Sequence, residues 1–339
     1  MDAKITKKRL ARILSYDWIK IVAIAAAFIL VWSLIFTTTA TRITPAQQFT
    51  VFNYHSNNLL GDDFYTSYSN ALGRDKIFSY EIIETNTNDL KSAGDEMAFT
   101  LLDTRVSVEE GDVMFVPNIS DLSSAYTDEN GQTQYERTYA QTFFYRTHMY
   151  LFDLDPENDK GYFKQMERYL NLFYTNGYTD ENSLNKAKVE ETFKARITAN
   201  KDKRFKKDEQ IAQGVQDEIA RIEKYRDALV EFYGYLADGT VTLTTMELKD
   251  ENGKVLKEGK YGINLCPDEN KTGELKKVFS YTTTEKYEEN GETKERPVVT
   301  AKDMNVMLFK FAGVETSFEY ESLLYVNYII RNALSATQA

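Results

Sequence analysis

The chain has 339 residues, of which 42% are hydrophobic, 13% aromatic and 27% charged, and its formal net charge is −11. This composition fits a folded protein and excludes collagen-like and strongly disordered classes, while the length allows two domains or one domain of two lobes. The single cysteine, Cys266, excludes an internal disulfide framework and a cysteine-rich zinc site.

An apolar segment near the N-terminus predicts a transmembrane helix over residues 18–40. From Ile21 to Phe36 every residue is apolar except Ser33. About 20 such residues in a helix cross a bilayer core of ~30 Å. A cleaved signal peptide is the competing interpretation, but its apolar region is usually only about 7–15 residues long, so we favour an uncleaved anchor. A buried core helix is disfavoured because the segment is apolar on all sides and is also flanked by a cationic tail.

The distribution of charge predicts the orientation of this helix. Basic residues are concentrated before it, whereas Arg42 is the only Lys or Arg that follows until Arg74. The positive-inside rule therefore predicts a cytoplasmic basic tail over residues 1–17 and an extracellular domain over residues 41–339, at the cell membrane. The first 40 residues carry a net charge of +4, which leaves −15 on the extracellular domain. Such an acidic domain argues against nucleic acid as a partner.

The first part of the extracellular domain predicts a strand-helix-strand unit. Gln47–Tyr54 and Ile77–Thr85 combine β-branched and aromatic residues, as strands do. A helix is expected from about Ser92 to Gly111, followed by a buried strand over Asp112–Val116. A strand, helix and strand in this order form a βαβ unit, so we expect an α/β fold with parallel strands.

The middle of the chain predicts three helices, over Tyr162–Tyr174, Lys186–Thr198 and Asp208–Tyr235. The basic run Lys201–Lys207 is interpreted as a solvated connection between two of them, with a membrane-binding or partner-binding patch as the alternative. The apolar stripe of the third helix is formed by Ile211, Val215, Ile219, Ile222, Tyr225 and Leu229.

Strands are expected again after Gly239. Three Asn-Gly pairs, Asn130-Gly131, Asn252-Gly253 and Asn290-Gly291, are typical tips of β-hairpins because both residues accept positive φ angles. The last two apolar segments, Met304–Phe311 and Tyr320–Leu334, are predicted to be helical.

The sequence contains no catalytic motif that we recognise: G-x-S-x-G, H-E-x-x-H and G-x-G-x-x-G are all absent. The alternating acids Asp153, Asp155, Glu157 and Asp159 are interpreted as a solvated loop, because the glycine and the terminal Glu of a calcium loop are not at the required spacing. We therefore predict no enzyme activity, no cofactor and no metal site. A surface glycan hydrolase is a disfavoured third alternative, since 52 acidic residues give some close carboxylate pairs in any fold.

Residues 50–117 resemble the N-terminal lobe of the extracellular solute-binding proteins of ABC importers. The resemblance rests on the two strands, the helix, and the stretch Gly111–Val116, which looks like the family's strand entry. Tyr261–Leu265 and Glu321–Tyr328 look like a later strand and the closing helix of membrane-anchored relatives in Gram-positive bacteria. The chain departs from the family in having neither a recognisable signal peptide nor a lipobox cysteine.

The resemblance implies a bilobed, periplasmic-binding-protein-like domain. One lobe would comprise about 45–125 and part of 300–339, a helical lobe about 140–235, and a β-rich segment about 238–300. It also implies that the chain captures a small solute, such as a sugar or oligosaccharide, and presents it to ABC-type permease subunits. The alternative is a structural or adaptor domain of a transport complex that no longer binds solute, with a cleft filled by side chains or by the 120–160 segment.

The candidate ligand-binding residues follow the predicted parallel strands, because ligands of such sheets collect beyond the carboxyl ends of strands. Tyr54, His55 and Asn57 follow the first strand, and Asn118 follows Pro117 at the end of the third. Tyr54 would stack on an apolar face of the ligand, and the other three would supply hydrogen bonds. The alternative is that these residues cap the sheet edge and satisfy loop backbone.

Overall fold

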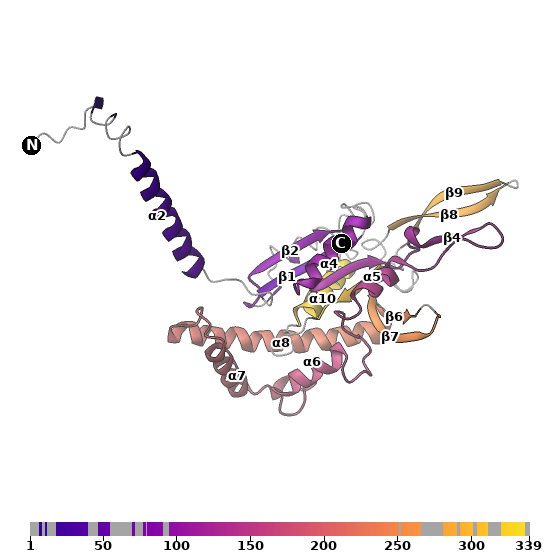
Figure 1. Cartoon of the computed structure of the whole chain (residues 1–339). Coiled ribbons are helices and arrows are strands. Elements are labelled where there is room, and N and C mark those ends of the chain that lie inside the picture. The colour runs from indigo at the N-terminus through magenta and orange to yellow at the C-terminus, as the bar shows by residue number, and fades with distance from the viewer. Residues whose placement is uncertain are drawn as a thin grey trace, which may run out of the picture. The chain divides into compact units, whose positions relative to one another are not determined.

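The computed structural model of the chain describes residues 7–8, 11, 18–39, 47–54, 70–71, 77–78, 80–90, 95–250, 252–265, 281–289, 292–300, 304–310 and 320–335. The chain divides into two compact units, Met1–Ile43 and Thr44–Ala339. The second unit holds all the described strands and every helix after the N-terminal one (Figure 1).

The N-terminal unit contains helix α2, Trp18–Thr39. Among the described residues it is the one helix long and apolar enough to cross a membrane, over Trp18–Phe36, and its large apolar side chains are exposed. A single apolar helix of this length is compatible with a single-pass anchor, as the sequence predicts. The cytoplasmic location of residues 1–17 and the absence of cleavage stay predictions.

Six strands of the second unit form one mixed sheet, in the order β2-β1-β3-β10-β7-β6. Strand β1 lies between β2 and β3 and is parallel to both, whereas β10, β7 and β6 are joined by antiparallel pairs, and β10 is also antiparallel to β3. Helix α4 connects β2 to β3, so the predicted strand-helix-strand unit and its parallel strands are confirmed. The bounds are Gln48–Asn53 (β1), Glu84–Asp89 (β2), Asp95–Ser107 (α4), Val113–Pro117 (β3), Thr242–Lys249 (β6), Val255–Asn264 (β7) and Met304–Leu308 (β10).

Helices cover both faces of this sheet. Alternate residues of a strand point to opposite faces, so Phe49 and Val51 of β1 pack with one helical layer and Phe52 with the other. The first layer contains α6, α8 and α10, and the second contains α4 and α5. The bounds of the remaining helices are Tyr139–Thr147 (α5), Tyr162–Asn171 (α6), Lys186–Ala199 (α7), Asp208–Asp238 (α8) and Glu321–Ser335 (α10).

The three helices predicted for the middle of the chain are confirmed as α6, α7 and α8. The predicted stripe of α8 faces the core: Ile211 is half-buried and its other five members are buried. The helix ends at Gly239, whose φ of 79° is the left-handed conformation that favours glycine at helix ends. Helix α10 confirms the predicted C-terminal helix.

Three β-hairpins occur where Asn-Gly pairs predict them. β4 (Ala125–Thr127) pairs with β5 (Thr133–Tyr135), β6 with β7, and β8 (Tyr281–Glu289) with β9 (Glu292–Thr300). Of the three tips, Asn290-Gly291 lies outside the described residues, between the paired Glu289 and Glu292.

The predicted second strand, Ile77–Thr85, is placed wrongly by about seven residues. The strand begins at Glu84 and is almost entirely polar, with the sequence ETNTND. The aromatic residues before it pack into the helical layer instead, since the Phe78 ring lies 4.4 Å from the Phe49 ring and 6.4 Å from the Tyr325 ring. Because β2 is an edge strand, it buries little surface and needs no apolar run.

The helix predicted over Met304–Phe311 is also wrong, because Met304–Leu308 is strand β10. The strand lies between β3 and β7 and all five residues are buried. A short apolar run that is buried on both faces has no alternation of polar and apolar residues, so its sequence does not distinguish strand from helix.

The strands of residues 45–125 and of 238–265 belong to one sheet, since β10 joins β3 to β7. Residues 44–339 also form one compact unit. The second unit is therefore a mixed α/β domain, and its division into two lobes stays a prediction.

Candidate functional site

The carboxyl ends of the parallel strands lie together, as the sequence predicts. The backbone NH of Tyr54 donates to Phe115 O of β3 at 2.9 Å, and Leu90 NH donates to Asn53 O at 2.8 Å. Asn118 follows directly after β3. The structure thus brings Tyr54 and Asn118 to one edge of the sheet, whereas His55 and Asn57 lie outside the described residues.

Helix α5 covers this edge at Tyr54. The tyrosine is 1% exposed, and its ring lies 5.1 Å from the Tyr139 ring and 4.6 Å from the Phe143 ring. Ring pairs at these separations are ordinary core contacts. The ligand-stacking role of Tyr54 stays a prediction, and it requires α5 to move away.

Asn118 holds the start of the same helix. The Thr138 hydroxyl donates to Asn118 Oδ1 at 2.6 Å, and Thr138 Oγ1 accepts from Gln141 NH at 3.2 Å, which caps the N-terminus of α5. In this arrangement Asn118 supports the loop and helix that close the edge, as the sheet-capping alternative expects.

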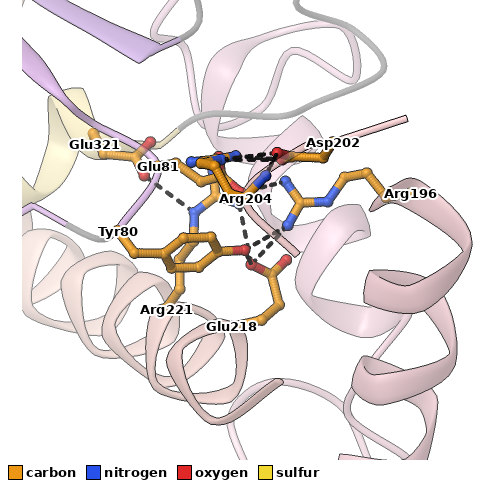
Figure 2. Close-up of polar contacts among 8 residues, drawn as sticks. All are labelled: Tyr80, Glu81, Arg196, Asp202, Arg204, Glu218, Arg221 and Glu321. Carbon is orange, nitrogen blue, oxygen red and sulfur yellow. Dashed lines mark hydrogen bonds and ion pairs between the residues drawn. The ribbon is translucent and has the colours of Figure 1, made fainter. Parts of the chain in front are cut away.

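A second polar cluster, which we call the ionic network, lies in the helical layer on the other face of the sheet (Figure 2). It joins four separate parts of the chain: the turn before β2, helix α7 with its connection to α8, α8 itself, and α10. Its members are Tyr80, Glu81, Arg196, Asp202, Arg204, Glu218, Arg221 and Glu321.

Glu81 is the centre of the outer half of the network. Arg196 Nη1 donates to Glu81 Oε1 at 2.8 Å, and Arg204 Nη2 donates to Glu81 Oε2 at 2.9 Å. Arg204 also donates to both oxygens of Asp202. The Glu81 side chain is 8% exposed, so both of its oxygens are satisfied by guanidinium groups rather than by water.

Glu218 connects this outer half to the buried half. Its Oε2 accepts from the Tyr80 hydroxyl at 2.8 Å and from Arg196 Nη2 at 3.0 Å, and lies 3.5 Å from Arg221 Nη1. Arg221 in turn donates from Nε to Glu321 Oε1 at 3.1 Å, and both side chains of that pair are 2% exposed. The network therefore runs from the surface of α7 to α10 in the core.

Electrostatics keeps the outer carboxylates ionised and the tyrosine neutral. Burial alone would raise the pKa of Glu81, but Arg196 and Arg204 hold it below the usual value. Burial raises the pKa of Tyr80, and the Glu218 charge raises it further. These groups do not exchange protons near neutral pH, so the arrangement is suited to holding four chain segments in register.

This network is not predicted from the sequence. Lys201–Lys207 is not simply a solvated connection: Arg204 joins the network, and the Phe205 ring packs 5.1 Å from Phe193 and 6.0 Å from Tyr80. A phenylalanine in the middle of a basic run is the signal that this connection folds inward. Glu218 and Arg221, which lie beside the apolar stripe of α8, are a second such signal.

Within the described residues, no group of three or more His, Cys, Asp or Glu side chains is placed to hold a metal ion. In the acidic loop after Phe152, Asp153 and Asp155 accept hydrogen bonds from backbone NH groups two residues ahead, and Asp155 pairs with Lys260 at 3.1 Å. These contacts fit the interpretation of a solvated turn.

Comparisons with protein-family models, with curated proteins and with solved structures found no match to this chain. The resemblance to extracellular solute-binding proteins therefore stays a prediction.

Proposed function

We propose that this chain is a membrane-anchored, non-enzymatic extracellular protein that acts as a structural or adaptor subunit of a membrane transport complex. The observation that carries the proposal is the cover over the end of β1. A protein that captures a solute at this edge needs it open, whereas α5, which belongs to the 120–160 segment, packs Tyr139 and Phe143 onto Tyr54.

The partners of such an adaptor would be the permease subunits, with α2 holding the chain in the bilayer beside them. The ionic network supports this role, because it fixes α7, α8 and α10 relative to the sheet and so gives a partner a surface of constant shape. Buried charges that pair with one another in this way favour one arrangement of segments over others rather than adding much stability.

Co-purification from native membranes tests the adaptor role. The tagged full-length chain is recovered in mild detergent, with and without a mixture of sugars and peptides, and the permease subunits that accompany it are quantified. We expect equal recovery in both conditions. As a matched control, a chain whose residues 18–39 are replaced by an unrelated transmembrane helix separates partners of the extracellular domain from partners of α2. Absence of permease subunits, or recovery only with an added solute, would contradict the proposal.

A solute-binding protein is the second candidate, favoured by Asn53 at the end of β1. Its side chain is 6% exposed and its Oδ1 has no hydrogen-bond partner within the described part of the chain. Asn53 alternates with Phe52 and Tyr54 along β1, so its side chain lies on the face of the sheet opposite α5. A buried amide oxygen without a partner is costly, and a ligand or water that reached this face would satisfy it. If this candidate is right, Asn53→Leu abolishes the stabilisation given by the solute.

A further inference from the structure

We propose that the recess between the edge strand β2 and the C-terminal end of α4 binds a neutral polyhydroxylated ligand, such as a carbohydrate. The recess has a volume of about 400 Å³. Small-molecule sites usually enclose about 300–1,000 Å³, so a mono- or disaccharide fits. The recess runs along the β2 edge of the sheet and is not lined by Tyr54 or Asn118, and the proposal does not depend on the adaptor role.

The strand register brings the lining side chains to one face. Gln48 pairs with Glu84, and Phe52 pairs with Asn88. Residues paired in this way, and their neighbours two positions along, share a face of the sheet. Because Phe52 packs with α4, the same face presents Gln48, Glu84, Asn86 and Asn88 to the end of that helix.

Helix α4 supplies the opposite wall through Arg105 and Glu110, whose side chains form an ion pair at 2.8 Å. Glu110 NH donates to Arg105 O and Glu109 NH donates to Val106 O, which is the pattern of a Schellman cap. Glu109 has a φ of 61°, in the left-handed region that a residue with a side chain rarely adopts. The turn thus directs Glu110 back toward Arg105 at the expense of a strained backbone.

The chemistry of the lining favours hydroxyl groups. The walls are polar, so they do not suit an acyl chain or an aromatic ring. Amide side chains both donate and accept hydrogen bonds and carboxylates accept them, which matches a sugar hydroxyl that does both. The half-buried amides of Asn86 and Asn88 have no hydrogen-bond partner among the described residues, so their donors and acceptors are available to a ligand.

The charge of the recess excludes anions. The Arg105 charge is neutralised by Glu110, and Glu84 adds a second carboxylate, so the ionised side chains of the lining carry a net charge of −1. A phosphate or an acidic sugar would be repelled, and a neutral ligand is the class that the site fits.

Saturation-transfer NMR on the full-length chain in lipid nanodiscs tests the proposal, with glucose and N-acetylglucosamine as probes. Nanodiscs avoid detergents with sugar headgroups. At about 10 mM probe, we expect saturation transfer from the protein to the sugar protons. A dissociation constant near this concentration leaves a measurable fraction of the protein occupied. Asn88→Ala should weaken binding by about tenfold, as expected for the loss of a well-placed hydrogen bond. Glu84→Gln, at an exposed position, supplies a second variant should Asn88→Ala fail to fold.

Asn130→Ala, at the exposed tip of the β4–β5 hairpin, is the matched amide control and should bind the probes like the unmodified chain. Equal transfer in the unmodified and the Asn88→Ala chains would overturn the proposal, as would binding of spermidine or inorganic phosphate without binding of either sugar. Failure of the adaptor role is distinguishable, because it appears as loss of permease co-purification and leaves sugar transfer unchanged.

Discussion

At the scale of single residues, the carboxylate of Glu81 is the point where the turn before β2 meets α7 and the α7–α8 connection. Replacing it by Gln would leave two guanidinium groups facing a neutral amide in a largely buried setting. Removing one partner of a buried ion pair costs about 3–5 kcal/mol, so Glu81→Gln should lower the free energy of unfolding by an amount near that range at pH 7. The exposed pair Lys188–Glu191 provides the control, and Glu191→Gln should cost less than about 1 kcal/mol. Urea unfolding measures both, and equal effects would contradict the assigned role of Glu81.

The same residue makes stability depend on pH. Because the pKa of Glu81 is lower in the folded state than in the unfolded chain, its charge stabilises the fold above the unfolded pKa, about 4.3. This contribution is lost as the pH falls from about 4.3 through the folded pKa. We expect the difference in stability between the unmodified chain and Glu81→Gln to shrink over that range. A difference that stayed constant down to the pH of acid unfolding would contradict the assignment.

Glu109 offers a test of backbone strain. At a φ of 61°, a residue with a Cβ costs about 1 kcal/mol relative to glycine. Glu109→Gly should therefore raise the free energy of unfolding by up to about 1 kcal/mol, whereas Glu110→Gly, next to it and without positive φ, should lower it because the Arg105 ion pair is lost. Thermal unfolding distinguishes the two, and destabilisation by Glu109→Gly would show that its side chain matters more than the strain.

At the scale of elements, the two glycines of α8 differ in what surrounds them. A Cβ on Gly214 would lie 2.5 Å from Phe193 Cζ and 2.6 Å from Phe205 Cε1, whereas a Cβ on Gly234 would meet nothing within 4 Å. Helix propensity alone predicts that Ala stabilises both positions by about 1 kcal/mol. We expect Gly234→Ala to raise the free energy of unfolding by this amount. We expect Gly214→Ala to lower it by about 1–3 kcal/mol, because the rings of Phe193 and Phe205 have to shift. Stabilisation by both would mean that α7 does not pack closely on α8.

The same elements show what the sequence can and cannot predict. The helical periodicity of α8 is readable because one face is buried and the other is solvated. Strand β10 is misassigned because it is buried on both faces, so its residues show no alternation of polar and apolar side chains. The start of β2 is misassigned because this edge strand buries little of either face and also shows no such alternation. The pairs of the ionic network cannot be predicted from the sequence, because Glu81, Arg204 and Glu321 are far apart in the chain and only the fold brings their charges together.

At the scale of the whole molecule, the proposed orientation predicts which residues a membrane-impermeant reagent reaches. With Cys266 replaced by Ser, a cysteine introduced at Asn130 should react with an impermeant maleimide in intact cells. One introduced at Ala3 should react only after the membrane is opened, because the basic tail is predicted to be cytoplasmic. Labelling of the cysteine at position 3 but not of the one at position 130 in intact cells would show the opposite orientation and would contradict an extracellular role.

The most direct test of the adaptor role is the melting temperature of the full-length chain in nanodiscs across a broad library of sugars, oligosaccharides and peptides. The Asn88→Ala variant is used, so that the proposed recess on β2 does not contribute. A ligand present at about 100 times its Kd stabilises the native state by about 2.7 kcal/mol, which shifts the melting temperature by several degrees. We predict no shift with any compound, because α5 closes the strand ends at Tyr54. A clear rise with one compound that disappears in the additional variant Asn118→Ala would show that the edge opens and binds solute, and would contradict the adaptor role.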